Sequence, residues 1–123
     1  MTEYLDPEDV EQLIASAGFH YRGGNRHLLL SALATPLPVF GEEVYPELEH
    51  KAAVLLIAIN RDHPLADGNK RLSWIVAKAF LALNGLDLAT GVREGDRFVR
   101  SVADESPKFE EVAQWITHHT TVL

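Results

Sequence analysis

The residues best suited to chemistry lie together between positions 61 and 74, in the stretch RDHPLADGNKRLSW. His63 has a side chain that can accept a proton near neutral pH. Asp67 offers a lone carboxylate, the usual ligand for a Mg²⁺ ion that also binds phosphate oxygens. Lys70 and Arg71 add two positive charges three and four residues after Asp67. A base, a metal-binding carboxylate and adjacent cations are the groups that phosphoryl or nucleotidyl transfer requires.

Two more residues of the stretch suit an anion site. Gly68 would let the backbone approach a ligand closely, and Asn69 offers an amide for a phosphate oxygen or a helix cap. Ordinary structural roles also fit each residue taken singly. Asp67, Gly68 and Asn69 could form a turn, while Lys70 and Arg71 could be solvated surface charges. The order and crowding of all these residues favour a functional site.

The elements on either side of the stretch would place it at the centre of the molecule. Residues 47–60 predict a helix that is apolar on all sides from Ala52 to Ile59 and therefore buried. Residues 69–85 predict a second helix that ends at Gly85. The start of this second helix offers unpaired backbone N–H groups and the positive end of a dipole, which attract anions. Its expected buried face comprises Leu72, Ile75, Val76, Ala79, Phe80 and Leu83.

The remaining segments also predict helices, and no convincing strand pattern is present. Asp6 and Pro7 form a helix start, and residues 35–46, with three prolines and a glycine, predict a loop. We therefore expect an all-α, single-domain fold over residues 1–123. It should contain about six helices, with a loop or short extended flap before the central helix pair. The shorter expected helices cover residues 6–18, 25–34, 94–105 and 108–119.

Composition narrows the possible partners and location. Eleven lysines and arginines against eighteen aspartates and glutamates give a net charge of −7, so we expect no direct binding to nucleic acid. The absence of cysteine excludes disulfides and fits a reducing cytoplasm. The longest near-apolar run, AAVLLIAI, has eight residues and is too short to cross a bilayer. The expected location is cytoplasmic, without a membrane segment.

The segment HPLADGNKR, His63 to Arg71, resembles the signature of the Fic/Doc family, H-x-F-x-(D/E)-(A/G)-N-(G/K)-R. The similarity extends over nearly the whole chain. Lys70 resembles the Doc branch, the toxins of Phd–Doc toxin–antitoxin modules. The Fic branch transfers AMP and has a glycine there and a further arginine where this chain has Trp74. Leu65 replaces the family's phenylalanine and is expected to point into the core and anchor the loop.

The resemblance implies a role for each matching residue. His63 would be the catalytic base, and Asp67 would hold Mg²⁺ and help to orient the acceptor. Lys70 would stabilise the transferred γ-phosphate of ATP. Arg61 matches an arginine often found two residues before the histidine, and residues 35–46 match the flap that registers a target polypeptide. The nucleotide phosphates would bind in an anion hole formed by Gly68, Asn69, Lys70 and Arg71.

The implied function is that of a Doc-type toxin that uses ATP and Mg²⁺ to phosphorylate a threonine of elongation factor Tu and so arrest translation. The implied partner is a Phd-type antitoxin whose C-terminal segment folds along the toxin. Two alternatives are a Fic-type AMP transferase and a non-catalytic module that only binds an antitoxin. Lys70 and Trp74 favour phosphate transfer over AMP transfer. The complete set of site residues argues against a module without catalysis.

Overall fold

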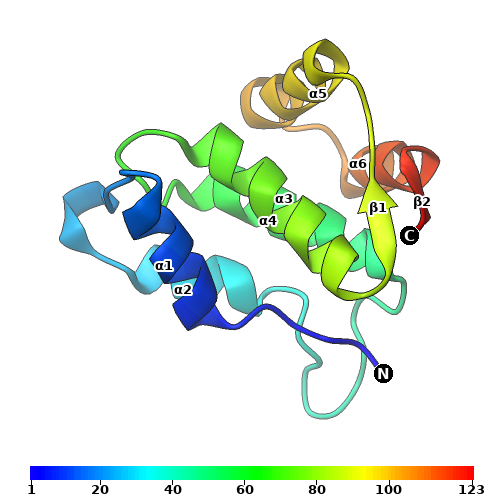
Figure 1. The fold of residues 1–123 in the computed structure, drawn as a ribbon. Helices are drawn as coiled ribbons and strands as arrows, with labels where there is room; N and C mark the ends of the chain where they lie inside the picture. Colours follow the sequence, from blue (N-terminus) through cyan, green and yellow to red (C-terminus); the bar gives the residue numbers. More distant parts are fainter.

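The computed structural model describes all residues, 1–123, and confirms the all-α fold with six α-helices. A 3₁₀ turn, Arg22–Gly24, and two short strands complete the fold (Figure 1). In chain order the helices are α1 (Pro7–Ser16), α2 (His27–Ala34), α3 (Leu48–Asp62), α4 (Asn69–Leu83), α5 (Val92–Glu105) and α6 (Phe109–His118). None of them is long and apolar enough to span a membrane.

Helices α3 and α4 lie side by side at the centre, with α1 and α2 on one side and α5 and α6 on the other (Figure 1). As expected, the apolar run of α3 from Ala52 to Ile59 is buried, and every residue from Lys51 to Asn60 except Ile57 is buried. Because α3 contacts α2, α4, α5 and α6, it has almost no face left for solvent. The hydrophobic core therefore surrounds α3, and the segment that follows α3 leaves directly from the core.

The buried face of α4 differs from the expected one. The sequence predicted that Ala79 and Leu83 would be buried, but both are exposed. Ser73 and Ala77 are buried instead, because α4 packs against α3 through a stripe that includes small residues. The Ser73 hydroxyl accepts a hydrogen bond from Asn60 Nδ2 of α3 at 2.8 Å. A pattern of large apolar residues overlooks such a stripe, since small and hydrogen-bonded polar residues can be buried at little cost.

Local signals at the helix ends behave as the sequence indicates. The Asp6 carboxylate accepts a hydrogen bond from the Glu8 N–H at 2.9 Å and so caps α1. Gly85 follows α4 with φ +84°, a left-handed conformation that ends the helix. The chain then forms β1 (Leu86–Leu88), which pairs antiparallel with β2 (Thr120–Val122). The sequence prediction missed both strands, since three residues are too few to show an alternating pattern.

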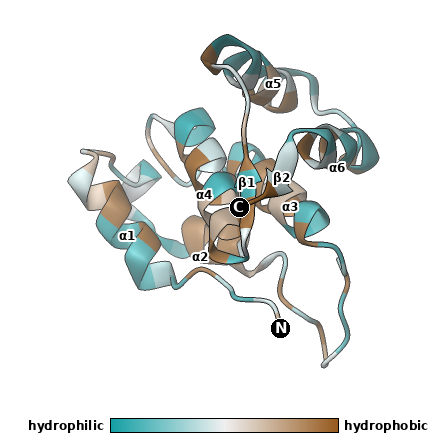
Figure 2. Cartoon of the chain, turned by 45° about the vertical axis from the view of Figure 1, so that its right-hand side comes forward, coloured by the Kyte–Doolittle hydropathy of each residue, from teal (hydrophilic) through white to brown (hydrophobic).

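Helix α5 packs against the core less fully than α4. Its buried residues are Gly95, Phe98, Val99 and Val102, and the rest of its surface is strongly polar. Figure 2 shows hydrophilic and hydrophobic residues alternating along its length. β1 and the segment after it lead the chain away from α4. Helix α5 therefore does not pack closely along α4. The space between these two helices forms a groove.

Candidate active site

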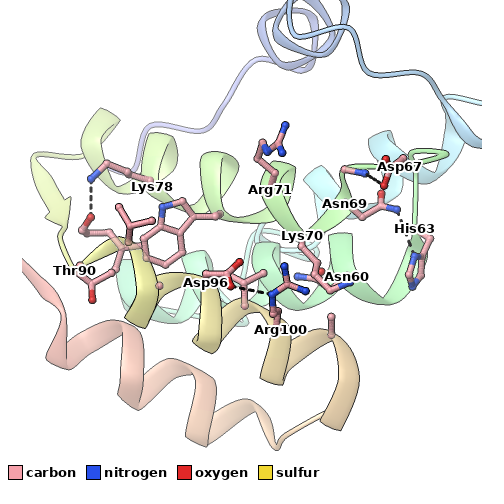
Figure 3. A pocket seen from close by; sticks show the side chains of 18 of the residues that line it. Asn60, His63, Asp67, Asn69, Lys70, Arg71, Lys78, Thr90, Asp96 and Arg100 are labelled. Carbon is pink, nitrogen blue, oxygen red and sulfur yellow. Dashed lines mark hydrogen bonds and ion pairs between the residues drawn. The ribbon is translucent and has the colours of Figure 1, made fainter.

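A groove of about 890 Å³ lies between α4 and α5 and brings together most of the predicted site residues (Figure 3). His63 and Asp67 stand near one end, and Lys78 and Thr90 near the other (Figure 3). Six predicted residues line it: His63, Asp67, Gly68, Asn69, Lys70 and Arg71. The sequence motif therefore forms one wall of a single groove.

The first turn of α4 presents an uncapped helix end to this groove. No side chain caps it, and the first intrahelical bond runs from the Leu72 N–H to the Gly68 carbonyl at 2.9 Å. The N–H groups of Asn69, Lys70 and Arg71 therefore have no acceptor within the helix. The side chains of Lys70 and Arg71 are exposed beside them. Free N–H groups, a positive dipole end and two cations together make an anion-binding end.

Asn69 holds the loop that precedes α4. Its Oδ1 accepts a hydrogen bond from the Leu65 N–H at 2.8 Å, and its Nδ2 donates to the Leu65 carbonyl at 3.0 Å. The same Nδ2 lies 3.4 Å from Nδ1 of His63, so the amide also orients the imidazole. Leu65 itself is 1% exposed, which confirms that it points into the core in place of phenylalanine. The Asn69 side chain thus fixes the loop, while its backbone N–H is one of the free N–H groups at the start of α4.

His63 has an unusual backbone. It ends α3 with φ 50° and ψ 62°, a left-handed conformation that is rare for residues other than glycine. Arg22 stabilises this turn, because its Nε donates to the His63 carbonyl at 2.8 Å and its Nη2 to the Asp62 carbonyl at 3.1 Å. The Arg22 N–H also donates to the Pro64 carbonyl at 2.9 Å. A residue far away in the sequence therefore supports the loop that carries the histidine.

Gly68 is required at its position for two reasons. Its φ of +97° disfavours any other residue, and an added Cβ would lie 2.7 Å from Cε1 of Phe19. The same Phe19 ring lies 5.8 Å from the Arg71 guanidinium, a cation–π contact. Phe19 therefore packs against the loop at Gly68 and helps to hold Arg71.

The second wall of the groove comes from α5 and the segment before it. Arg100 lines this wall, and its Nε donates to the Asp96 carboxylate at 2.9 Å (Figure 3). This bond and the charge of Asp96 raise the pKa of Arg100, so Arg100 is a permanent cation. Among the lining residues, four cations stand against two carboxylates, although the whole chain has a net charge of −7. The groove is thus a positively charged site on an acidic protein.

Arg61 lies apart from the other predicted site residues. It lines a smaller cavity on the other side of His63, and its Nε donates to the Asp62 carboxylate at 2.8 Å. The hydrogen bond to Asp62 is the main cause that raises the pKa of Arg61. In this arrangement Arg61 does not face the first turn of α4.

The predicted flap, residues 35–46, is a loop with a minimal hairpin at its tip. Val39 and Glu42 exchange two backbone hydrogen bonds, and Phe40 and Gly41 between them both have positive φ. Phe40 is fully exposed. The base of the loop is held by Lys51 of α3, a fully buried residue whose ammonium binds the Glu43 carboxylate at 2.6 Å and the Tyr45 carbonyl. The flap is therefore tied to the same helix that ends at His63.

Several residues of the site escaped the sequence prediction. Arg22 and Phe19 support the loop from the segment after α1, and Asp96 and Arg100 form the second wall. None of them lies in a motif, and a helical pattern assigns Asp96 and Arg100 only to an exposed face. Only the fold brings them to the site, so no signal in the sequence indicates their role.

The groove thus brings a histidine together with an anion-binding helix end, and comparison with known proteins identifies the family. The model of the Fic/DOC family matches residues 4–81, and the chain belongs to this family. Toxin Doc of Mycolicibacterium smegmatis (strain ATCC 700084 / mc(2)155) is 40% identical over 121 residues, which cover 92% of this chain and 90% of that protein. The chain is thus a Doc-type toxin. No solved structure matches it.

Proposed function

We propose that this toxin transfers the γ-phosphate of ATP to a hydroxyl group of a target protein. The observation that carries the proposal is that His63 and the uncapped start of α4 line one groove. A base and an anion-binding helix end in the same groove can hold an acceptor hydroxyl and a phosphate side by side. A module that only binds an antitoxin needs neither.

In the proposed step the acceptor hydroxyl loses its proton to the imidazole of His63. Its oxygen forms a bond to the γ-phosphorus, the bond between that phosphorus and the β–γ bridging oxygen breaks, and ADP leaves. The N–H groups at the start of α4 and the ammonium of Lys70 stabilise the charge on the phosphate oxygens. Lys70 lines the groove and its ammonium makes no hydrogen bond within the chain, which supports this role.

The chemistry of Asp67 fits a Mg²⁺ ion shared with phosphate oxygens. Its carboxylate is exposed in the groove, and only Oδ1 is engaged, by the Gly68 N–H at 2.9 Å. No group of three or more His, Cys, Asp or Glu residues could enclose a metal. A single carboxylate suits Mg²⁺, which keeps several waters and takes its other ligands from the substrate. When bound, the ion would neutralise phosphate charge.

The proposed target is a threonine of elongation factor Tu, so that phosphorylation arrests translation and growth. The flap supports a polypeptide acceptor, since its exposed hairpin offers backbone groups for pairing and an apolar tip at Phe40. As a toxin of a toxin–antitoxin module, the protein has an antitoxin as partner. We propose that this antitoxin is of the Phd type and binds through its C-terminal segment.

A labelling experiment tests the proposal. Purified toxin is incubated with elongation factor Tu, Mg²⁺ and ATP that carries ³²P at either the γ- or the α-phosphate. The expected result is label on the target from γ-labelled ATP alone, at a threonine identified by mass spectrometry. Label from α-labelled ATP would show AMP transfer instead. Omission of Mg²⁺ is the matched control, and co-expression with a Phd-type antitoxin should relieve growth arrest.

A further inference from the structure

The end of α6 and the start of α5 meet at an ion pair outside the groove. His119, which follows α6, points both of its ring nitrogens at acceptors. Nε2 lies 2.6 Å from Oε1 of Glu94 in the first turn of α5, and Nδ1 lies 2.7 Å from the Trp115 carbonyl. The backbone N–H of His119 bonds instead to the Ile116 carbonyl at 3.1 Å. The pair Glu94–His119 is thus a clasp between α5 and α6.

The two bonds of the clasp require a particular protonation state of His119. A backbone carbonyl and an ionised carboxylate can only accept hydrogen bonds, so both ring nitrogens must donate. Only the doubly protonated, positively charged imidazole carries a hydrogen on each nitrogen. The helix ends favour these charges, since the carboxyl end of α6 attracts a cation and the amino end of α5 attracts the Glu94 carboxylate. When the ring loses one proton, one of the two bonds must be lost.

Glu94 is the titratable group that faces the ring of His119. No other acidic side chain forms an ion pair with either ring nitrogen, and Glu94 pairs with no other cation. The last turn of α6 carries one further titratable residue, His118, which is exposed. On β1, Asp87 is already paired with Lys78 at 3.2 Å. A change of pH near neutrality therefore acts on the clasp through His119 itself.

The imidazole of His119 also belongs to a stack of rings that reaches the groove. Its centroid lies 3.8 Å from that of Trp115 at an interplanar angle of 17°, and Phe98 of α5 lies on Trp115 at 3.7 Å and 5°. Because both rings are nearly parallel to the indole and equally close to its centre, they must cover its opposite faces. Trp74, which lines the groove from α4, meets the same indole edge to face at 6.2 Å. The stack thus connects the clasp to both walls of the groove.

The clasp holds the α5 wall of the groove, which is formed by α5 and the segment before it. Glu94 lies between Val92 and Gly95, which both line the groove. The His119 carbonyl accepts a hydrogen bond at 2.9 Å from the N–H of Ala89, another lining residue. No side chain caps the start of α5, so its first turn depends on contacts such as the clasp. Loss of a clasp bond should therefore let the α5 wall move relative to α4.

We propose that the Glu94–His119 clasp positions the α5 wall, so that the groove binds its anionic ligand most tightly while His119 carries both ring protons. His119 is thus a positioning residue that lies outside the groove, and the loss of one ring proton at higher pH loosens the wall. This role concerns the shape of the groove and holds whichever group the toxin transfers. Only the choice of ATP as the ligand in the binding test rests on the proposed function.

The absence of cysteine from the chain allows the position of the wall to be measured without any ligand. Spin labels are attached to Ala79→Cys on α4 and Arg97→Cys on α5, two exposed positions that do not line the groove. Electron paramagnetic resonance then gives the distribution of distances between the two helices. We expect a narrow distribution at about pH 6 and one about 1.5 times as wide at about pH 8.5, where the imidazole is neutral. Equal widths at both pH values would overturn the proposal.

Glu94→Gln separates the effect of protonation from that of packing. The new amide can donate to Nε2 of a neutral imidazole whose Nδ1–H still donates to the Trp115 carbonyl, so both bonds persist without the second ring proton. We expect this variant to keep the narrow distribution at both pH values. Glu105→Gln is the matched control, since it removes the same charge from the exposed far end of α5 and should behave as wild type. A distribution in Glu94→Gln that still widens with pH would contradict the clasp.

His119→Phe removes both bonds and keeps an aromatic ring on Trp115. The stack should preserve the fold, which circular dichroism checks, while the distance distribution should be wide at both pH values. A narrow distribution in His119→Phe would show that packing alone holds the wall, and it would refute the role of the two bonds.

Calorimetry with ATP connects the wall to ligand binding. Between about pH 6 and about pH 8.5, the Kd for ATP should rise about two- to fivefold more in wild type than in Glu94→Gln, within the contribution of one hydrogen bond. ATP and His63 are common to both proteins, so their own titrations cancel in this comparison. Equal changes in Kd would refute the effect on binding. If wild type binds no ATP at either pH, the proposed function fails, and the distance measurements alone decide whether the clasp positions the wall.

Discussion

The two walls of the groove are built in different ways. The α4 wall is one continuous stretch of chain. Leu65, which is 1% exposed, and Leu72, which is 0% exposed, anchor it in the hydrophobic core. The α5 wall meets the groove with Asp96 and Arg100, whose side chains are both 61% exposed and paired mainly with each other. The first wall carries the proposed base, the carboxylate proposed to bind Mg²⁺ and the start of α4. The second carries one exposed ion pair, in which the cation stands on a long side chain.

This difference suggests a division of labour. Groups that take part in bond making must be held in place, because small displacements greatly reduce rates. Asn69, Arg22 and Phe19 hold the α4 wall from three directions. A cation that only attracts phosphate needs no such support, since charge attraction acts over several ångströms. Changes to the α4 wall should therefore affect rate or folding, and changes to the α5 wall should affect affinity modestly.

The largest effect is expected from replacement of His63, the proposed base. His63→Asn keeps a residue type that tolerates the left-handed backbone at this position, so the fold should remain intact. We expect phosphate transfer to fall by about 10²–10⁴-fold, the usual contribution of a general base. The Kd for ATP should stay near the wild-type value. Transfer by His63→Asn at a rate within a few-fold of wild type would exclude His63 as the base.

The next largest effect concerns the support of the α4 wall. Gly68→Ala places a Cβ 2.7 Å from Phe19 and adds a side chain at positive φ, so it should destabilise the fold by about 1–3 kcal/mol. Chemical denaturation measures the free energy of unfolding. In Gly68→Ala combined with Phe19→Leu, the loss of stability caused by the clash should be recovered. The loss caused by the positive φ of residue 68 should remain. No recovery of stability in the double variant would mean that contact with Phe19 is not a reason for the glycine at position 68.

The contrast between the walls also explains what the sequence could predict. The α4 wall was predictable because its residues are contiguous and follow a signature, and the structure brings His63, Asp67 and Lys70 into one groove. The central helix α3 was predictable because a run that is apolar on all sides has to be buried. The buried face of α4 was predicted wrongly at Ala79 and Leu83. The contact with α3 instead buries the smaller residues Ser73 and Ala77.

What the sequence could not predict depends on contacts between distant segments. Arg22 reaches the His63 carbonyl across 41 positions, and an arginine after a short helix carries no sign of that partner. Arg100 faces the groove only because β1 and β2 direct the chain that leads to α5. Asn60 reads as an ordinary end to an apolar helix, and its unpaired oxygen becomes visible only when its neighbours are placed.

The α5 wall is tested by Arg100→Gln. Removal of this exposed cation should weaken ATP binding by about two- to fivefold, the range of a solvated charge interaction, with little change in the rate at saturating ATP. The effect should diminish as salt rises. Arg97→Gln on the same helix is the matched control, because Arg97 is exposed but does not line the groove. Equal effects of the two substitutions would mean that net charge matters and the position of Arg100 does not.

The smallest effect, opposite in sign, is expected from Asp96→Asn. Asp96 both holds Arg100 through the 2.9 Å bond and places a negative charge on the groove. Its neutralisation should tighten ATP binding by about twofold, since a single exposed charge interaction contributes little in water. In an Arg100→Gln background only the charge of Asp96 remains to be removed, so the gain should be smaller. A double-mutant cycle by calorimetry separates the two contributions. If Asp96→Asn instead weakens ATP binding, the ion pair positions Arg100, and the α5 wall is organised more like the α4 wall than its exposure indicates.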